Sequence, residues 1–455
     1  MRRAALLLLL VGSIAAALYS WNALRRPNVV LITVDSLRPD YLSCYGRQRV
    51  ATPRIDALAN AGIVFTQAVT DVPWSRGAMA SVMTGQYAFR HRVRSMYERL
   101  PDDAPTLAEA FRTGGYRTAA IVDSFDLDHI FRLGRGFDVY DDRCEEPVVG
   151  LNPRPLRLVS VYFGDMEQDR NWRRRKLRNN GMRSDERTTD AAVAWLRHIG
   201  GQSFFLWVHY FGARERWPDG VGAAELIAQY PERVAAADAA VGRLLQAIAD
   251  FGLERQTLVV LHADHGRSLL EHGGVLLGGE LYESSVHVPL IVRWPGALPA
   301  GHRVDTLVHL IDIFPTLADF AGLSTPRNLD GESLNGVIHG IGRRGAPEAY
   351  AETYVPATAP AGQETEVDGE QGGFGFVRRA IRTQRWKYIR SEPSTPLAQP
   401  ESAAPPPELP RQSAREELYD LSRDPGETVN LIDQEPAVAT ALRGQLEQHG
   451  AAPTR

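Results

Sequence analysis

The chain has 455 residues, of which 44% are hydrophobic and 23% are charged. This composition is that of a globular protein with one large core or two, and it excludes a mostly disordered chain, a collagen-like chain and a multi-pass membrane protein. With 51 Lys and Arg against 55 Asp and Glu, the net charge of −4 argues against a nucleic-acid-binding protein, and 2 cysteines are too few for a disulfide scaffold or a cysteine-based zinc cluster.

The N-terminal residues 1–25 are predicted to be a targeting segment. Residues 4–24 carry no charge, and as a helix these 21 residues would be about 31 Å long, enough to span a bilayer. Ala15 and Ala17 fit a signal-peptidase site, so a cleaved signal peptide is one interpretation. The uncharged stretch ends at Arg25, which favours an uncleaved membrane anchor; a buried N-terminal helix is the third interpretation. Under the first two, the rest of the chain is exported, either anchored and facing the periplasm or extracellular space, or secreted.

Apolar runs alternate with amphipathic segments along most of the chain. Strands are predicted at 28–34, 118–122, 204–210, 257–262 and 288–292, and helices at 78–85, 106–113, 188–199, 231–251 and 311–321. This alternation predicts an α/β fold with a mostly parallel sheet flanked by helices. Ligands of such sheets bind at the carboxyl ends of strands, and Asp35 and Asp264 both lie just past such ends.

The C-terminal part differs from the rest in its pattern. Residues 377–390 predict paired short strands, 416–421 a further strand and 436–448 a terminal helix. Residues 391–410 hold seven prolines in 20 residues, which predicts an extended or disordered loop. We therefore expect a main α/β domain over 26–350 and a smaller α+β subdomain over 351–455.

A basic run, Arg173-Arg174-Arg175-Lys176, interrupts the alternation. It could form a nucleic-acid or anionic-lipid patch. Acidic residues flank it on both sides, among them Asp169 and Asp185, which favours a solvated insertion loop without a nucleic-acid partner.

Three polar segments are predicted to meet at one metal site. Asp35 ends the first strand, Asp264-His265-Gly266 follows a later strand, and Ser75 stands in a turn before a predicted helix. Two carboxylates and an imidazole suit one divalent cation. A serine at a helix start, beside a cation, would have a lowered hydroxyl pKa and could act as a nucleophile. Taken singly, each segment is more typical of a helix cap or a surface turn than of a metal site or a nucleophile.

The order and surroundings of these segments resemble the sulfatase family of the alkaline phosphatase superfamily. The resemblance runs from about residue 26 to 431. It rests on RPNVVLITVDSLRPDYLSCYG at 26–46 and on blocks at 52–59, 84–85, 106–110, 136–142, 204–211, 258–266, 271–273, 281–293 and 417–431. So many matches in order make the resemblance specific.

The resemblance implies a metal-dependent hydrolase. Asp35, Asp264 and His265 would be the metal ligands, with Ca²⁺ as the expected ion and Mn²⁺ or Mg²⁺ as alternatives. Ser75 falls at the nucleophile position. The implied reaction is in-line attack on a sulfate, phosphate or phosphonate ester, through a covalent ester that is then released. The implied substrate is a small anionic ester or a sulfated glycan.

The nucleophile segment departs from the family pattern. Family sulfatases carry Cys or Ser, any residue, Pro, any residue, Arg, which is the signal for conversion to formylglycine. Here Gly77 stands in place of the proline and Met79 in place of the arginine. We therefore expect no formylglycine and an unmodified Ser75 as the nucleophile.

Groups that contact the substrate also depart from the pattern. The Asp-Pro-His block that often follows the third predicted strand is Gly212-Ala213-Arg214 here, and Leu277 to Gly279 stand where a His or Lys usually protonates the leaving group. Arg76 and Arg214 are predicted to hold an anionic ester instead, because a guanidinium binds such groups bidentately. His272 keeps its place in the pattern and is the remaining acid–base candidate.

Three other histidines are interpreted as structural. His209 and His262 lie within predicted strands, and His91 is expected on the surface or in a loop.

Three functions compete on this sequence. The first is a divalent-metal hydrolase of sulfate or phosphate esters that uses Ser75. The second is a catalytically degenerate family member that binds an anionic ligand or a partner, because several acid–base positions are altered. The third, a membrane-bound phosphoryl-group transferase, is weaker, because such relatives have several N-terminal membrane spans and this chain has one at most.

Overall fold

The computed structural model describes residues 26–46, 49–95, 98–143, 183–213, 223–272, 279–341, 348–356, 374–393 and 415–450. The predicted targeting segment 1–25, the basic run at 173–176 and Arg214 lie outside the described residues. Within the described ranges, no helix has the length and apolar character that crossing a membrane requires.

The larger sheet has eight strands in the order β4-β3-β5-β1-β6-β7-β2-β8. The strands are β1 (Asn28–Val34), β2 (Ile63–Val69), β3 (Arg117–Ile121), β4 (Val139–Asp141), β5 (Phe204–Tyr210), β6 (Thr257–His262), β7 (His287–Arg293) and β8 (His302–His309). Only β7 pairs antiparallel to its neighbours, so the predicted mostly parallel sheet is confirmed. Every residue of β1, β5 and β6 is buried, because helices cover both faces of the sheet.

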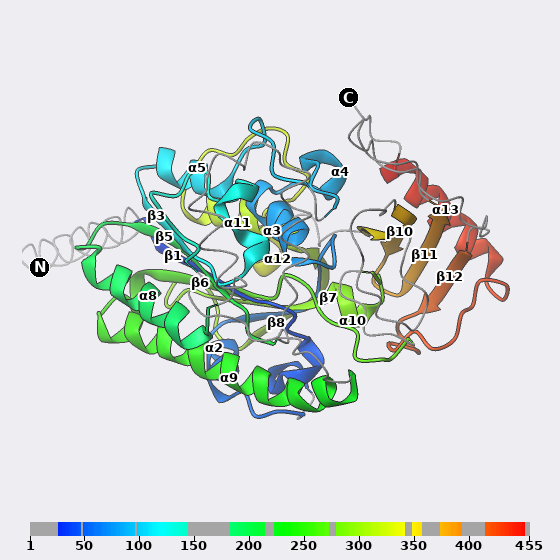
Figure 1. Ribbon diagram of the computed structural model, residues 1–455, viewed down its shortest axis with the longest axis horizontal. Coiled ribbons are helices and arrows are strands. Elements are labelled where there is room, and N and C mark those ends of the chain that lie inside the picture. The colour runs from blue at the N-terminus through cyan, green and yellow to red at the C-terminus, as the bar shows by residue number, and fades with distance from the viewer. Residues whose placement is uncertain are drawn as a thin grey trace, which may run out of the picture.

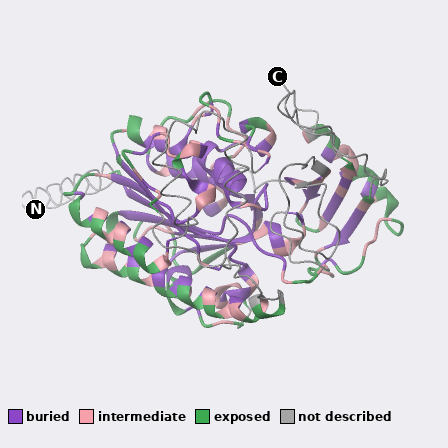
Figure 2. Cartoon of the chain, in the orientation of Figure 1, coloured by how far each residue is buried: buried purple, intermediate pink, exposed green. Residues whose placement is uncertain are grey.

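Helices cover the two faces of this sheet (Figure 1). One face carries α2 (Pro53–Asn60), α8 (Asp185–His198) and α9 (Ala223–Asp250); the other carries α3 (Ser75–Thr84), α5 (Leu107–Thr113) and α11 (Ile313–Phe320). Shorter helices are α4 (Ala88–His91), α10 (Glu283–Val286) and α12 (Asn335–Ile338). The buried residues concentrate along the strands and the inner sides of these helices (Figure 2).

A second, antiparallel sheet is formed by the C-terminal part, in the order β12-β11-β10-β9. Its strands are β9 (Ala349–Pro356), β10 (Phe374–Arg382), β11 (Trp386–Pro393) and β12 (Arg415–Asp420), and the terminal helix is α13 (Pro436–Gly450). The predicted strand pair and terminal helix are confirmed. The predicted proline-rich loop at 391–410 is wrong for residues 391–393, which extend β11 because they pair with β10; residues 394–410 lie outside the described residues.

Candidate active site and metal centre

The site lies where the three central strands end. Thr33 of β1 pairs with His209 of β5 on one side and with His262 of β6 on the other. Asp35 follows Thr33 of β1 by two residues, and Asp264 follows His262 of β6 by two residues, so the two aspartates lie at the same level. Both carboxylates are fully buried at the same edge of the sheet, as the sequence predicts.

Ser75 is the first residue of α3 and points at these groups. Its Oγ lies 3.1 Å from Oδ2 of Asp35 and 3.2 Å from Nε2 of His265. The residue before it, Trp74, takes the extended N-cap conformation, so Ser75 is not the cap of the helix. The hydroxyl is buried, at 2% exposure, and lies at the positive end of the helix dipole, which favours an oxyanion at this position.

The turn after β1 is held in a strained conformation. Ser36 has a φ of 61°, in the left-handed region that residues other than glycine seldom adopt. Its backbone N–H donates to Oδ1 of Asp264 (3.2 Å), and its hydroxyl donates to Oδ1 of Asp35 (2.6 Å). Tyr230 of α9 donates to its carbonyl (2.8 Å). These contacts fix the orientation of both carboxylates.

His265 presents one ring nitrogen to the site. Its Nδ1 lies 2.7 Å from the carbonyl oxygen of Gly266, which can only accept a hydrogen bond, so Nδ1 carries the proton. Its Nε2 keeps a lone pair and lies 3.6 Å from both Oδ1 of Asp35 and Oδ2 of Asp264. This is the tautomer that a metal ligand needs.

A further histidine, His209, lies in the same group. Its Nδ1 is 2.8 Å from Oδ1 of Asp123, and its Nε2 is 3.8 Å from Oδ2 of Asp264. Asp35, His209 and Asp264 each offer a ligand atom within 4.8 Å of the others. Burial lowers the pKa of His209, but the two carboxylates outweigh burial and raise it to about 10. The sequence predicts His209 within a strand and indicates a structural role for it, because nothing in the strand pattern indicates its neighbours.

These residues fit a divalent cation. Oδ2 of Asp264 and Nε2 of His209 are buried without hydrogen-bond partners among the described residues, and this oxygen lies 3.8 Å from Nε2 of His209 and 3.6 Å from Nε2 of His265. Burial raises the pKa of Asp264, but its interactions with His265 and His209 hold that pKa well below the usual range, so this carboxylate is ionised. Two carboxylates and two imidazoles are a sound donor set for one metal ion.

The guanidinium of Arg76 contacts residues other than Ser75. Its Nε donates to the carbonyl of Asp126 (3.0 Å), and its guanidinium lies over the ring of Phe131, 3.2 Å from the centroid. Only 2% of Arg76 is exposed, and burial lowers its pKa to about 10 despite the nearby charge of Asp126.

The described ring contact of His272 is with Tyr282, a residue that in turn binds the C-terminal sheet. The His272 ring stacks on Tyr282, with 3.6 Å between centroids and 14° between planes, and the Tyr282 hydroxyl donates to Glu417 of β12 (2.8 Å). Among the described residues, the groups within hydrogen-bonding distance of Ser75 Oγ are Asp35 and His265. The structure therefore brings together Asp35, Ser75, Asp264 and His265, but gives His272 no hydrogen bond to Ser75.

A buried network of hydrogen bonds supports helix α3. Ser81 of α3 donates to Oδ2 of Asp71 (2.8 Å) and lies 2.9 Å from Nε2 of His91. The expectation that His91 lies on the surface is wrong: it is 1% exposed, because the short helix α4 folds it back onto α3. Burial lowers the pKa of His91 to about 3 and raises that of Asp71 to about 7.

The Asp71→Asn variant should gain stability relative to wild type as the pH rises. Because the folded-state pKa of Asp71 exceeds its usual 3.8, the stability that its proton contributes is present below pH 4 and is lost by about pH 7. Asparagine does not ionise, so the difference in unfolding free energy should move in favour of the variant by about 2–4 kcal/mol across this window. Urea unfolding of both proteins at several pH values measures it, and parallel pH profiles would contradict the assignment.

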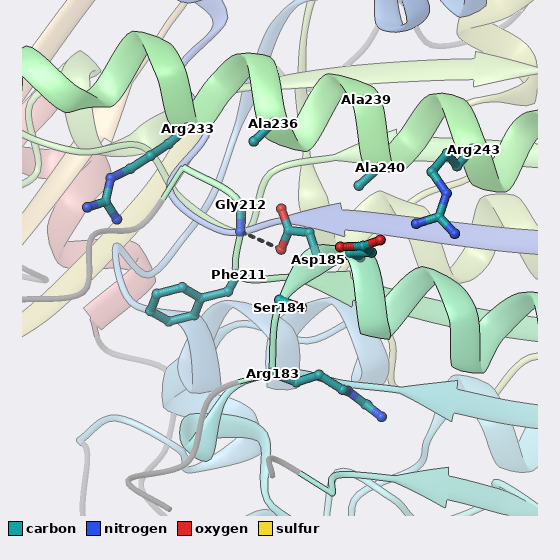
Figure 3. A pocket seen from close by; sticks show the side chains of 11 residues that line it. Arg183, Ser184, Asp185, Phe211, Gly212, Arg233, Ala236, Ala239, Ala240 and Arg243 are labelled. Carbon is teal, nitrogen blue, oxygen red and sulfur yellow. Dashed lines mark hydrogen bonds between the residues drawn. The ribbon is translucent and has the colours of Figure 1, made fainter. Parts of the chain in front are cut away.

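A cavity of about 500 Å³ is lined by Phe211 and Gly212, which follow β5 in the chain (Figure 3). It is bounded by the start of α8, by α9 and by Phe211 and Gly212, and its charged lining residues are Arg183, Asp185, Glu186, Arg233 and Arg243. The Gly212 N–H donates to Asp185 across it (3.2 Å). Neither Ser75 nor the buried carboxylates line this cavity, so we do not assign it to the chemical step.

Curated proteins of similar sequence include several sulfatases. The chain is 28% identical to arylsulfatase A of Bos taurus over 466 residues, which cover 93% of this chain and 86% of the relative. It is 24% identical to delta 4,5-hexuronate-2-O-sulfatase of Bacteroides thetaiotaomicron over 447 residues, which cover 90% and 85% of the two chains.

Solved structures with this fold include a phosphonate monoester hydrolase of Agrobacterium radiobacter. The TM-score is 0.67 at 22% identity, and the alignment covers 93% of this chain and 95% of the other. A 2-O GAG sulfatase gives a TM-score of 0.67 at 21% identity, with coverage of 93% and 92%. Residues 27–323, well over half of the chain, match the model of the protein family described as Sulfatase. The chain therefore belongs to the sulfatase family.

Proposed function

We propose that the protein is a metal-dependent hydrolase of sulfate, phosphate or phosphonate esters in which an unmodified Ser75 is the nucleophile. The observation that carries the proposal is the position of Ser75 Oγ, within 3.2 Å of both Asp35 and His265 at the start of α3. Asp35, Asp264 and His265 hold the cation. When bound, the cation stabilises the Ser75 oxyanion and the negative charge on the ester oxygens.

The reaction proceeds in two displacements at sulfur or phosphorus. Ser75 Oγ gives its proton to solvent and forms a bond to the central atom in line with the leaving oxygen, the bond to the leaving oxygen breaks, and the alcohol departs with a proton from solvent. In the second displacement water attacks the central atom and gives one proton to solvent, the bond to Oγ breaks, and Ser75 regains a proton from solvent.

The packing of α3 supports serine over formylglycine at this position. A Cβ on Gly77 would lie 2.7 Å from both the Trp74 ring and Val72 Cγ1, so the family proline has no space here. Met79, where the family has arginine, is fully buried and accepts a weak contact from the Thr33 hydroxyl at 3.8 Å. The packing around Gly77 and Met79 therefore supports an unmodified Ser75.

Restoring the family arginine should be destabilising. Met79→Arg would bury a guanidinium beside β1 and overpack the core, at a cost of about 3 kcal/mol. Met79→Leu, which conserves volume and charge, should cost less than about 1.5 kcal/mol. Urea unfolding of the two variants measures the difference, and equal stabilities would contradict the packing argument. Mass spectrometry of the wild-type peptide should find Ser75 unmodified.

The relatives indicate the class of ester. One named relative acts as a hexuronate-2-O-sulfatase, and one structural neighbour is described in complex with a glucosamine disulfate. They support a sulfated glycan or a small anionic ester as the substrate. The charge-free stretch at 4–24 supports export of the chain, anchored or secreted.

A degenerate binding protein is the second candidate. It is favoured by the engagement of Arg76 with Asp126 and Phe131 and by the stacking of His272 on Tyr282, which leave neither group at the nucleophile. Such a protein would bind metal and anion without turnover.

Turnover of a panel of nitrophenyl esters tests the proposal. The purified full-length chain is assayed with sulfate, phosphate monoester, phosphate diester and phosphonate, before and after chelation and with Ca²⁺, Mn²⁺ or Mg²⁺ added back. We expect metal-dependent turnover of at least one ester. We also expect alkyl esters to react far more slowly, because a positioned general acid contributes about 10²–10⁴-fold and the described residues provide none at Ser75. Metal binding without turnover would favour the degenerate protein.

A further inference from the structure

We propose that His209 is a fourth protein ligand of the metal, so that the centre holds two carboxylates and two imidazoles and prefers a first-row transition ion, such as Mn²⁺ or Zn²⁺, over Ca²⁺. The inference rests on the proposed function, since it concerns the same cation. It adds a residue from a different strand, β5, to the ligand set Asp35, Asp264 and His265.

The contacts of His209 are those of an oriented ligand. The side chain is fully buried, and Nδ1 faces Oδ1 of Asp123 at 2.8 Å. Asp123 is itself fixed, because its other oxygen accepts the backbone N–H of Phe211. A histidine that binds a metal characteristically donates its second ring nitrogen to a carboxylate in this way.

The second nitrogen of His209 faces a carboxylate oxygen across a gap. Nε2 and Oδ2 of Asp264 are 3.8 Å apart, which is too long for a hydrogen bond. Neither atom has another hydrogen-bond partner in the described part of the chain. Ligand atoms bound to one ion at about 2.0–2.4 Å lie about 3–4 Å apart, so this gap has the spacing of two neighbouring ligands.

His262 shows what a structural histidine looks like at the same level of the sheet. It pairs with Thr33 from the opposite side and is equally buried. Its Nε2 lies 3.0 Å from the Thr33 hydroxyl and its Nδ1 2.9 Å from the carbonyl of Ala263, so both nitrogens are satisfied. A histidine with both ring nitrogens hydrogen-bonded, like His262, serves packing alone. His209 instead has one ring nitrogen that can bind a metal ion.

The second imidazole determines the class of metal. Ca²⁺ is bound by oxygen ligands, whereas imidazole nitrogen suits the first-row transition ions. The expectation of Ca²⁺ from the sequence considered a single imidazole in the set. With His209 included, we expect Mn²⁺ to bind at least about 100-fold more tightly than Ca²⁺.

Electron spin-echo spectroscopy of the Mn²⁺-loaded full-length protein counts the bound imidazoles. We expect two coupled imidazole nitrogens in wild type and one in His209→Asn and in His265→Asn. The matched control, His262→Gln, should retain both. Asp123→Asn, which removes the orienting charge but keeps the ligand, should retain both nitrogens and weaken Mn²⁺ binding by about 10–100-fold. Circular dichroism establishes that each variant is folded.

The outcomes separate this inference from the proposed function. A wild-type protein with one coupled imidazole, or a His209→Asn variant with unchanged nitrogen count and Mn²⁺ affinity, would overturn the role of His209 and leave the metal site itself intact. A wild-type protein that binds no divalent ion would overturn both. Should His209→Asn fail to fold, the count in wild type and the Mn²⁺ affinity of Asp123→Asn decide the question, because a purely structural His209 predicts one nitrogen and unchanged affinity.

Discussion

Ser75→Ala should abolish turnover while leaving metal binding in place. The variant removes a hydroxyl that lies within hydrogen-bonding distance of both Asp35 Oδ2 and His265 Nε2, and it keeps both of those groups. Loss of the covalent route should lower kcat by about 10³-fold or more. Mn²⁺ affinity should change little, because the carboxylates and imidazoles remain.

Ser81→Ala is the matched control for this prediction. Ser81 lies on the same helix and is equally buried, but its partners are Asp71 and His91 instead of Asp35 and His265. It should lose stability and keep kcat within about threefold, because it acts through packing alone.

Acid-quenched wild-type enzyme should also carry one sulfo or phospho group on the peptide that contains Ser75. Full activity of Ser75→Ala would contradict its role as nucleophile.

Much of the fold was predictable because buried parallel strands have a simple pattern. The uninterrupted apolar runs of β1, β5 and β6 identify central strands, and their bounds agree with the prediction. Strands β2, β8 and β9 were not predicted, since their mixed composition gives no clear period of two. Helix α9 begins at Ala223, eight residues before the predicted start at Pro231. The proline resembles a first helical residue, but buried Tyr230 anchors the preceding turn by its hydrogen bonds to Ser36 and Arg38.

The candidate site was predictable only where a residue follows a strand or precedes a helix. Asp35, Ser75 and Asp264 stand at such boundaries, where polar residues are conspicuous against an apolar run. His209 lies inside the run of β5, and its partner Asp123 follows β3, the neighbouring strand. Nothing local in the sequence connects these two residues; only the strand order β3-β5-β1 brings them together beside Asp35. The positions of two other side chains are likewise determined by tertiary contacts: Arg76 lies over the ring of Phe131, and His272 stacks on Tyr282.

The two sheets are joined by a buried ion network centred on Glu283 at the start of α10. Arg382 of β10 donates to both of its oxygens, at 3.0 and 3.1 Å, and Lys387 of β11 lies 3.2 Å from Oε1. Lys387 also pairs with Glu427 at 3.0 Å, and both of these side chains are 1% exposed. Burial raises the pKa of Glu427 to about 7, although the charge of Lys387 opposes it.

Lys387→Met should therefore destabilise the protein strongly, by about 3–5 kcal/mol above pH 7, because it leaves two buried carboxylates without their shared cation. The pKa of Glu427 is higher in the folded protein than its usual 4.5. The stability that its protonation contributes is therefore fully present below pH 4.5 and is lost as the pH rises through 7. The penalty in the variant should accordingly shrink at pH 5 to 6, where Glu427 takes up a proton.

Arg385→Met provides the control for Lys387→Met, because its pair with Asp420 (2.7 Å) involves an arginine that is 49% exposed. Exposed ion pairs contribute little, so this variant should lose less than about 1 kcal/mol at every pH. Urea unfolding of both variants between pH 5 and 8 measures the two effects. Similar, pH-independent losses of unfolding free energy in the two variants would show that the ion network does not stabilise the junction of the two sheets. A large, pH-dependent loss for Lys387→Met alone would show that the C-terminal sheet is fixed to the α/β core by charge as well as by apolar packing.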